Sequence, residues 1–223
     1  MNEEMYERKI RQLSKETYNL ISAGEIVDRP SSALKEIIEN SLDAGATRID
    51  IEIESGGKHL LRVRDNGHGI NREDLRLAVA SHATSKIRNH EDLLSVRTLG
   101  FRGEALASIS AVSRFALTSN IYEEPAEGVS IKMNQPLNSE LFLEPSPHYR
   151  GTTVEIRDLF FNTPARKKFL RTDRTEFLKL EEVILLKKKL LCEQKFFKHE
   201  IQIIMYMYAL LVSGWDLILR QMM

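Results

Sequence analysis

The stretch from residue 30 to residue 65 constrains the fold most, because its apolar side chains change from a helical to a strand spacing. Pro30 suits a first helical turn, and Gly45 stands where a helix C-cap belongs. Between them, apolar residues recur at helical intervals, at Leu34, Ile37, Ile38 and Leu42. Isoleucines then alternate with acidic residues, at Ile49, Ile51 and Ile53. A turn at Ser55–Gly57 and a second strand at 60–64 complete the predicted helix and antiparallel hairpin.

The rest of the chain mixes further helices and strands. Helices are predicted from Asn71, over 104–111, from Asn162 and over about 173–184. Strands are predicted around 115–118, 129–133 and 153–157. Residues 81–103 show little periodicity and predict a long loop. Because hairpins dominate over β-α-β units, we expect an α/β fold of the α+β two-layer kind, with helices backing a mixed, mostly antiparallel sheet.

The composition is that of a globular chain, and its charge limits the kinds of partner that it could bind. Of the 223 residues, 42% are hydrophobic, and the 32 basic side chains balance the 32 acidic ones. Residues 1–184 carry a slight acidic excess, so this part is not a strongly basic nucleic-acid binder. The single cysteine, Cys192, allows no internal disulfide, which fits a reducing compartment. Residues 1–14 are polar and predict a mobile arm without a signal peptide.

The helix that follows Pro30 carries the first candidate site. Glu36, Asn40 and Asp43 share one helical face at i, i+4 and i+7. In the functional interpretation, one glutamate of this helix activates water and the Asn40 amide oxygen binds magnesium. In the alternative, the same residues are a solvated acidic face, and spacing alone does not separate the two.

The second candidate site is Asp65-Asn66-Gly67-His68-Gly69, at the end of a predicted strand. A hairpin turn is one interpretation, because Asn-Gly is a common turn pair. However, the residues that follow predict a helix and not a return strand. A carboxylate at a strand end can accept a hydrogen bond from an adenine amine, and nearby glycines let a base approach the backbone.

The third candidate site is the glycine-rich segment 99–106. Two glycines precede a predicted helix there, so free backbone N–H groups at its start would bind an anion. The preceding loop would then close over a nucleotide as a lid. A plain flexible linker is the alternative. A P-loop, a complete G-x-G-x-x-G, an H-E-x-x-H motif and a cysteine cluster for zinc are all absent from the sequence.

Taken together, these segments resemble the superfamily of gyrase-type, heat-shock-chaperone, histidine-kinase and MutL ATPases. The shared pattern is Glu36 with Asn40, then Asp65-x-Gly67-x-Gly69, a glycine-rich lid and Gly151–Thr153. Further segments resemble the MutL family of DNA mismatch repair proteins, at residues 22–27, 41–46, 82–87, 100–109 and 162–170. The resemblance runs from about residue 10 to residue 184.

The resemblance implies a Bergerat-type ATP-binding fold with a left-handed β-α-β unit, and it suggests roles. Glu36 would be the general base, Asn40 would hold magnesium, and Asp65 would bind the adenine amino group with help from Thr153. Gly67 and Gly69 would leave room for the base. The other nucleotide-binding residues would be Asp43 on the helix, Thr84, Ser85 and Lys86 near the ribose and phosphates, and Gly100, Phe101, Arg102 and Gly103 around the phosphates.

The implied function is an ATP-binding and ATP-hydrolysing switch in DNA mismatch repair, with ATP and magnesium as cofactors. It would link a MutS-type mismatch recognition protein to a downstream nuclease or helicase, contact DNA, and form an ATP-dependent homodimer. We expect it in the cytoplasm, or in the nucleus of a eukaryote, and not in a membrane. Two alternatives stay open: a nonfunctional fragment, and a non-catalytic module that binds MutS or DNA through the basic residues Arg166, Lys167, Lys168, Arg171 and Arg174.

Residues 185–223 depart from the family. MutL proteins continue into a second subdomain that supplies a lysine to the γ-phosphate, so we expect slow or lost turnover without it. The span from Ile201 to Leu219 is long and apolar enough to suggest a membrane helix, but Asp216 argues against one. We expect a mobile arm at 1–14, an ATP-binding domain at 15–184 and an atypical tail at 185–223, of frameshift or misjoined origin.

Overall fold

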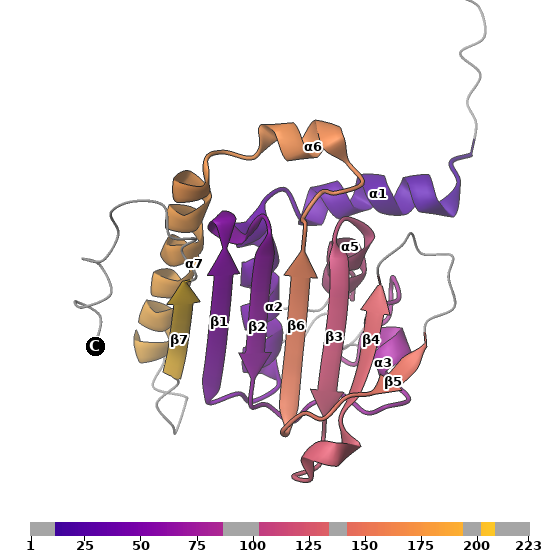
Figure 1. Cartoon of the computed structure of the whole chain (residues 1–223), viewed down its shortest axis with the longest axis vertical. Helices are drawn as coiled ribbons and strands as arrows, with labels where there is room; N and C mark the ends of the chain where they lie inside the picture. Colours follow the sequence, from indigo (N-terminus) through magenta and orange to yellow (C-terminus); the bar gives the residue numbers. More distant parts are fainter. Residues whose placement is uncertain (1–11, 87–102, 134–141, 194–201, 208–223) are drawn as a thin grey trace, which may run out of the picture.

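The computed structural model describes residues 12–86, 103–133, 142–193 and 202–207. These residues form a sheet backed by helices (Figure 1). The described strands are β1 (Arg48–Glu54), β2 (Leu60–Asp65), β3 (Arg114–Asn120), β4 (Val129–Met133), β5 (Leu143–Pro145), β6 (Gly151–Arg157) and β7 (Gln202–Met207). They lie in the order β5-β4-β3-β6-β2-β1-β7. The β1–β7 pair is parallel and the other pairs are antiparallel, which confirms the expected mixed, mostly antiparallel sheet.

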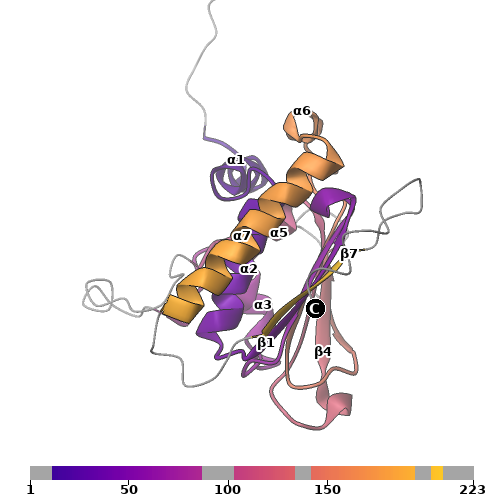
Figure 2. The same cartoon turned by 90° about the vertical axis from the view of Figure 1, so that its left-hand side faces the viewer.

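Most of the α-helices lie on one face of this sheet, and α6 lies above one end of it (Figure 2). The described helices are α1 (Lys15–Ile26), α2 (Pro30–Asp43), α3 (Leu75–Ala78), α5 (Ala105–Ala111), α6 (Pro164–Phe169) and α7 (Asp173–Glu193), with two short 3-10 turns, η2 (Ser55–Gly57) and η3 (Pro125–Glu127). The predicted two-layer arrangement is therefore confirmed. None of the helices in the described part of the chain is long and apolar enough to cross a membrane.

Helix α2 forms as its sequence predicts. Pro30 occupies the first turn, where a missing N–H costs nothing. The apolar stripe at helical spacing is buried, at Leu34, Ile37, Ile38 and Leu42. Ala44 caps the helix, and Gly45 follows at φ +73°, a left-handed conformation that glycine adopts freely. Burial of this stripe against the sheet fixes the position of the polar residues on the rest of the helix.

The β1–β2 hairpin forms the sheet surface beneath α2. Ile49, Ile51 and Ile53 are buried among the core residues, and the acidic residues between them point to the opposite face. On that face Arg62 forms ion pairs with Glu52 and Glu155, which satisfy the partly buried charges. The 3-10 turn at Ser55–Gly57 joins the two strands, as expected.

Several elements differ from the sequence expectations, and strands β5 and β7 were not predicted at all. Helix α1 was not predicted, although Ser14 caps it by accepting a hydrogen bond from the Thr17 N–H. Helix α3 begins at Leu75 and not at Asn71, because residues 71–74 form turns and the Asp74 side chain makes no cap hydrogen bond. Leu75 and Val79 nevertheless face inward, as expected.

Helix α7 was expected to end at about 184 but continues to Glu193. Leu180 and Ile184 are buried on its inward face before the expected end, and Lys187 continues this buried face into the extension. The expected boundary between a domain at 15–184 and a tail at 185–223 therefore falls within a helix, and this division stays a prediction. Most of the loop expected at 81–103, from 87 to 102, lies outside the described residues.

Candidate functional site

Asp65 is the centre of the site, at the end of β2 and beneath α2. Only 8% of Asp65 is exposed. Its Oδ2 accepts a 2.8 Å hydrogen bond from Ser41 Oγ on α2. Its Oδ1 accepts from the backbone N–H groups of Gly67 and Thr152, at 2.9 and 3.2 Å. Burial raises the pKa of Asp65 above its ordinary value of 3.8, although these three hydrogen bonds act in the opposite direction.

The hairpin-turn interpretation of residues 65–69 is wrong. Strand β2 pairs with β1 and β6, and the chain after Gly69 leads to α3. The glycines allow two close backbone approaches. A Cβ on Gly67 would lie 2.8 Å from Ala44 Cβ, and one on Gly69, where φ is +76°, would lie 2.2 Å from the Asn120 carbonyl oxygen. Each side chain would collide, so both positions require glycine.

Two of the three polar residues on α2 contact a lysine from a distant part of the chain. The Lys86 ammonium donates to Asn40 Oδ1 at 2.9 Å and to Asp43 Oδ2 at 2.5 Å. The exposed fractions of the Lys86 and Asp43 side chains are 19% and 11%, so the contact is sheltered from water. The structure therefore brings together three residues that the sequence assigned to one site.

The two glutamates of α2 have different surroundings. Glu39 is buried, and its Oε1 accepts from the Lys187 ammonium of α7 at 2.5 Å. The Glu36 side chain is 28% exposed, and its carboxylate lies 3.7 Å from Lys35 Nζ. Glu39 is therefore held in an ion pair away from water, whereas Glu36 is the accessible carboxylate on the face that also carries Asn40.

The segment 83–86 connects Lys86 to the start of α5. Thr84 Oγ1 accepts from the Lys86 N–H at 3.2 Å, and Ser85 is exposed. Gly103 lies against this segment at φ +64°, where a Cβ would be 2.4 Å from the Ala83 carbonyl oxygen. The other predicted phosphate-binding residues, Gly100, Phe101 and Arg102, lie outside the described residues.

The structure does not bring the Thr153 side chain to Asp65. Strand β6 alternates, so Thr152 faces the helices and Thr153 faces the opposite side of the sheet. The Thr153 hydroxyl lies 2.7 Å from His148 Nε2, whereas the Thr152 N–H bonds Asp65. Thr152, beside Asp65, is thus the neighbour that sequence reasoning missed. The buried Val154 and Ile156 are a period-two signal that would have identified it.

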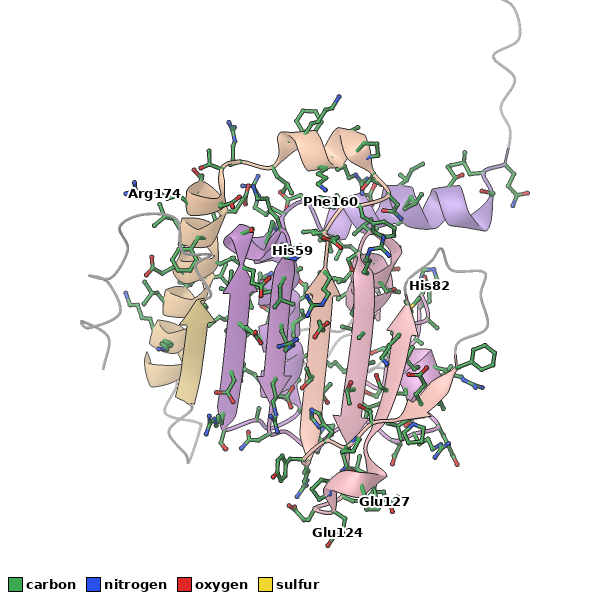
Figure 3. All side chains as sticks on the ribbon, in the orientation of Figure 1. His59, His82, Glu124, Glu127, Phe160 and Arg174 are labelled. Atoms are coloured by element: carbon green, nitrogen blue, oxygen red, sulfur yellow. The ribbon has the colours of Figure 1, made fainter. Side chains whose placement is uncertain are left out.

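Ser41 and Ser119 are further residues that sequence reasoning missed. Ser41 bonds Asp65, and the Ser119 hydroxyl lies 2.9 Å from both the Gly151 carbonyl oxygen and the Thr152 hydroxyl. Both serines are buried. The site lies at the end of the sheet that also carries η3, where Glu124 and Glu127 are labelled in Figure 3. Ser41 lies in the family-like segment 41–46, but the sequence does not reveal the role of either serine, because these roles depend on contacts between elements.

The oxygen atoms on α2 suit a hard cation. Magnesium prefers oxygen ligands and is held by one or two carboxylates together with phosphates and waters. Asn40 Oδ1 and Asp43 Oδ2 already converge on one cationic group, so they fit such an ion. Across the described ranges, no cluster of three or more His, Cys, Asp or Glu side chains could hold a metal by itself. A metal on α2 would therefore need ligands from a bound molecule.

Comparisons with known proteins agree with this geometry. A family model described as "Histidine kinase-, DNA gyrase B-, and HSP90-like ATPase" matches residues 28–140. The DNA mismatch repair protein MutL of Cellvibrio japonicus is 59% identical over 177 residues, which are 79% of this chain and 28% of that protein. MutL of Haemophilus influenzae (strain PittEE) is 57% identical over 175 residues, with 78% and 28% covered. The chain thus spans little more than a quarter of these relatives.

Among solved structures, the Aquifex aeolicus MutL ATPase domain complexed with ADP is similar, with a TM-score of 0.61 and 35% sequence identity. The match covers 82% of this chain and 61% of that one. The family model covers half of the chain and includes α2, Asp65 and the segment that carries Lys86. The chain therefore belongs to the histidine kinase-, DNA gyrase B- and HSP90-like ATPase family, in which its sequence is similar to MutL.

Proposed function

We propose that the site around Asp65 binds the adenine of ATP. The observation that carries this proposal is the fixed Asp65 carboxylate, which accepts hydrogen bonds from Ser41, Gly67 and Thr152. An ionised carboxylate has about four acceptor positions, so one remains for an adenine amine. Family membership and the ADP-bound structural neighbour support the same assignment. With Thr153 on the opposite face, Thr152 is the threonine proposed to lie beside the base.

The polar face of α2 would carry out the hydrolysis. Glu36 is accessible and would orient the attacking water as general base. Asn40 Oδ1 and Asp43 Oδ2 would hold magnesium, which would supply positive charge to offset the charge that develops during phosphoryl transfer. Thr84, Ser85, Lys86 and Gly103 would line the phosphate side. Positioning and charge stabilisation, and not covalent chemistry, would provide most of the catalysis.

The proposed biological role is a nucleotide-driven switch in DNA mismatch repair, because the relatives that the chain matches are MutL mismatch repair proteins. A MutS-type recognition protein, a downstream nuclease or helicase, DNA and a second copy of the chain are the proposed partners. An ATPase role is favoured over a non-catalytic module, since the matched family model and the structural neighbour are both ATPases.

Direct binding of a fluorescent ADP derivative tests the nucleotide site. The full chain should bind it saturably with magnesium present, and unlabelled ATP should compete. Asp65→Asn keeps the size of the side chain but replaces one acceptor with a donor that faces the adenine amine, so it should abolish binding. Lys132→Met on β4 is the matched control, because Lys132 is exposed, pairs with Glu144, and lies on a strand that β3 and β6 separate from β2. Equal binding by Asp65→Asn and the unsubstituted chain would contradict the assignment.

DNA contact by α6 is a second candidate function. Lys167, Lys168 and Arg171 are exposed near α6 beside Phe169, which is 82% exposed. Arg166 is not part of this surface, because its guanidinium packs over Gly24 and donates to the Ile21 carbonyl oxygen. Lys167→Glu with Lys168→Glu should weaken DNA binding and reduce its salt dependence, whereas Lys132→Glu should not. If the double variant bound DNA with unchanged salt dependence, the α6 surface would be excluded as a DNA-binding site.

A further inference from the structure

Lys86 places a positive charge where a metal ion would bind α2. Its ammonium nitrogen lies 2.9 Å from Asn40 Oδ1 and 2.5 Å from Asp43 Oδ2. These are the two oxygens that suit magnesium. An ordinary surface ion pair is exposed and weak, but here 19% of the Lys86 side chain and 11% of the Asp43 side chain are exposed. The ammonium therefore contacts two oxygen atoms at a position sheltered from water.

A lysine and a divalent cation cannot share these oxygens. Magnesium binds oxygen at about 2.0–2.1 Å and requires nearly octahedral geometry. An ammonium within hydrogen-bond distance of the same two atoms would occupy that coordination shell, and two cations at such separation repel each other. One must leave before the other binds.

We propose that Lys86 is a built-in counter-cation, which occupies the magnesium position until magnesium arrives with a nucleotide. This proposal rests on the proposed function and adds an order of binding to it. Without nucleotide, Lys86 neutralises Asp43 and excludes free metal. When the nucleotide brings magnesium, the metal takes Asn40 and Asp43, and the released ammonium is close enough to pair with the phosphates.

The same exchange connects the metal position to the start of α5. The Lys86 N–H is bonded to Thr84 Oγ1, and Thr84 Cβ lies 3.0 Å from the position of a Cβ on Gly103. The Ala83 carbonyl oxygen is closer still to that position, at 2.4 Å. A displacement of Lys86 would therefore take place beside a turn that packs directly against Gly103.

Metal binding without nucleotide tests the proposal. Manganese is the probe, because its free ion is measured directly by electron paramagnetic resonance and it prefers the same oxygen ligands. The full chain, Lys86→Met, Lys86→Arg and the control Lys132→Met are titrated with manganese alone. Lys86→Met should bind manganese at least about tenfold more tightly than the unsubstituted chain, since a hydrogen bond to a charged group is worth about that factor. Lys86→Arg and Lys132→Met should match the unsubstituted chain.

A double variant identifies the oxygens. Lys86→Met combined with Asn40→Ala should lose the gained affinity, because one of the two freed ligands is removed. Lys86→Gln replaces Lys86→Met if the latter does not melt cooperatively. Equal manganese affinity in Lys86→Met and the unsubstituted chain would overturn the proposal. Because no nucleotide is present, this result does not depend on the proposed ATP binding. The proposal of ATP binding would be contradicted separately if no form of the chain bound the fluorescent ADP derivative.

Discussion

Ser41 Oγ donates a 2.8 Å hydrogen bond to Asp65 Oδ2, and this contact joins α2 to the end of β2. Both residues are buried, so the bond is shielded from water. The proposed adenine contact on β2 and the proposed catalytic face of α2 are thereby held in one rigid unit. Ser41 follows Asn40 directly in the sequence, and the two side chains contact Asp65 and Lys86, respectively.

Replacement of Ser41 should therefore weaken nucleotide binding without unfolding the chain. Ser41→Ala removes a hydrogen bond to a charged group, worth about 1.5–3 kcal/mol, so the dissociation constant should rise about tenfold or more. Fluorescence titration with the ADP derivative measures this change. Ser32→Ala is the control, because Ser32 lies on the same helix but bonds Asp28 at its opposite end. Equal losses in the two variants would show a general effect on α2.

Asp65 should give nucleotide binding a characteristic pH dependence. Burial raises the pKa of its carboxyl above 3.8, so the group becomes protonated at a higher pH than an exposed aspartate. A protonated carboxyl accepts an adenine amine poorly, and affinity should fall as the pH drops through this raised value. The ionised form also opposes folding, so Asp65 contributes stability that is present below 3.8 and is lost as the pH rises through the folded-state pKa.

Asp65→Asn separates these two effects. The amide does not ionise, so the variant should melt at neutral pH no lower than the unsubstituted chain while it fails to bind nucleotide. Thermal melts and binding titrations across the acidic range provide the comparison. A variant that melts well below the unsubstituted chain at neutral pH would mean that the Asp65 carboxylate stabilises the fold, contrary to the direction of its pKa.

Glu36 should be required for turnover but not for binding. Glu36→Gln keeps the shape of the side chain and removes the base, and loss of a general base costs about 10²–10⁴-fold in rate. Phosphate release should fall by that factor while the affinity for the ADP derivative stays within about twofold. Loss of nucleotide affinity in Glu36→Gln would contradict its proposed role.

Glu39 and Lys187 should behave as one buried ion pair. Lys187→Met leaves the buried Glu39 carboxylate with only the more distant Lys35 ammonium, at 3.8 Å, which should lower the free energy of unfolding by up to about 3–5 kcal/mol. The double variant Lys187→Met with Glu39→Gln should recover most of this loss, because no unpaired charge remains. Denaturant melts of the four forms give the coupling energy.

Lys179→Met is the control for this pair. It removes an exposed ion pair with Glu182 and should change stability by less than about 1 kcal/mol. Additive effects of Lys187→Met and Glu39→Gln would refute the coupling.

Much of the fold could be predicted, because local patterns determine it. Buried isoleucines at every second residue of β1 and the apolar stripe of α2 gave the strand and the helix. Helix α1 was not predicted because its apolar residues do not recur regularly at helical spacing. The end of α7 was misplaced because a buried lysine, Lys187, replaces an apolar residue on its inward face. A lysine predicts exposure unless its partner across the fold is known.

Only the part of the candidate site that depends on local geometry could be predicted from the sequence. The face shared by Glu36, Asn40 and Asp43 follows from helix geometry alone. The choice between Glu36 and Glu39 required the contact with Lys187, which is far along the chain. Thr153 was expected beside the adenine base. Neighbouring residues of a strand point to opposite faces of the sheet, and it is Thr152 that points to the face covered by the helices. Contacts between elements, such as Ser41 with Asp65, leave no sequence pattern.

Thermal melting with a non-hydrolysable ATP analogue and magnesium tests the central claim most directly. A ligand that binds only the folded state stabilises it, by about 2.7 kcal/mol at a hundredfold excess over its dissociation constant. We predict a rise in melting temperature that requires magnesium, is absent in Asp65→Asn and loses its magnesium dependence in Asn40→Ala. A cooperative melt that neither nucleotide nor magnesium shifts would contradict the assignment of this site to ATP.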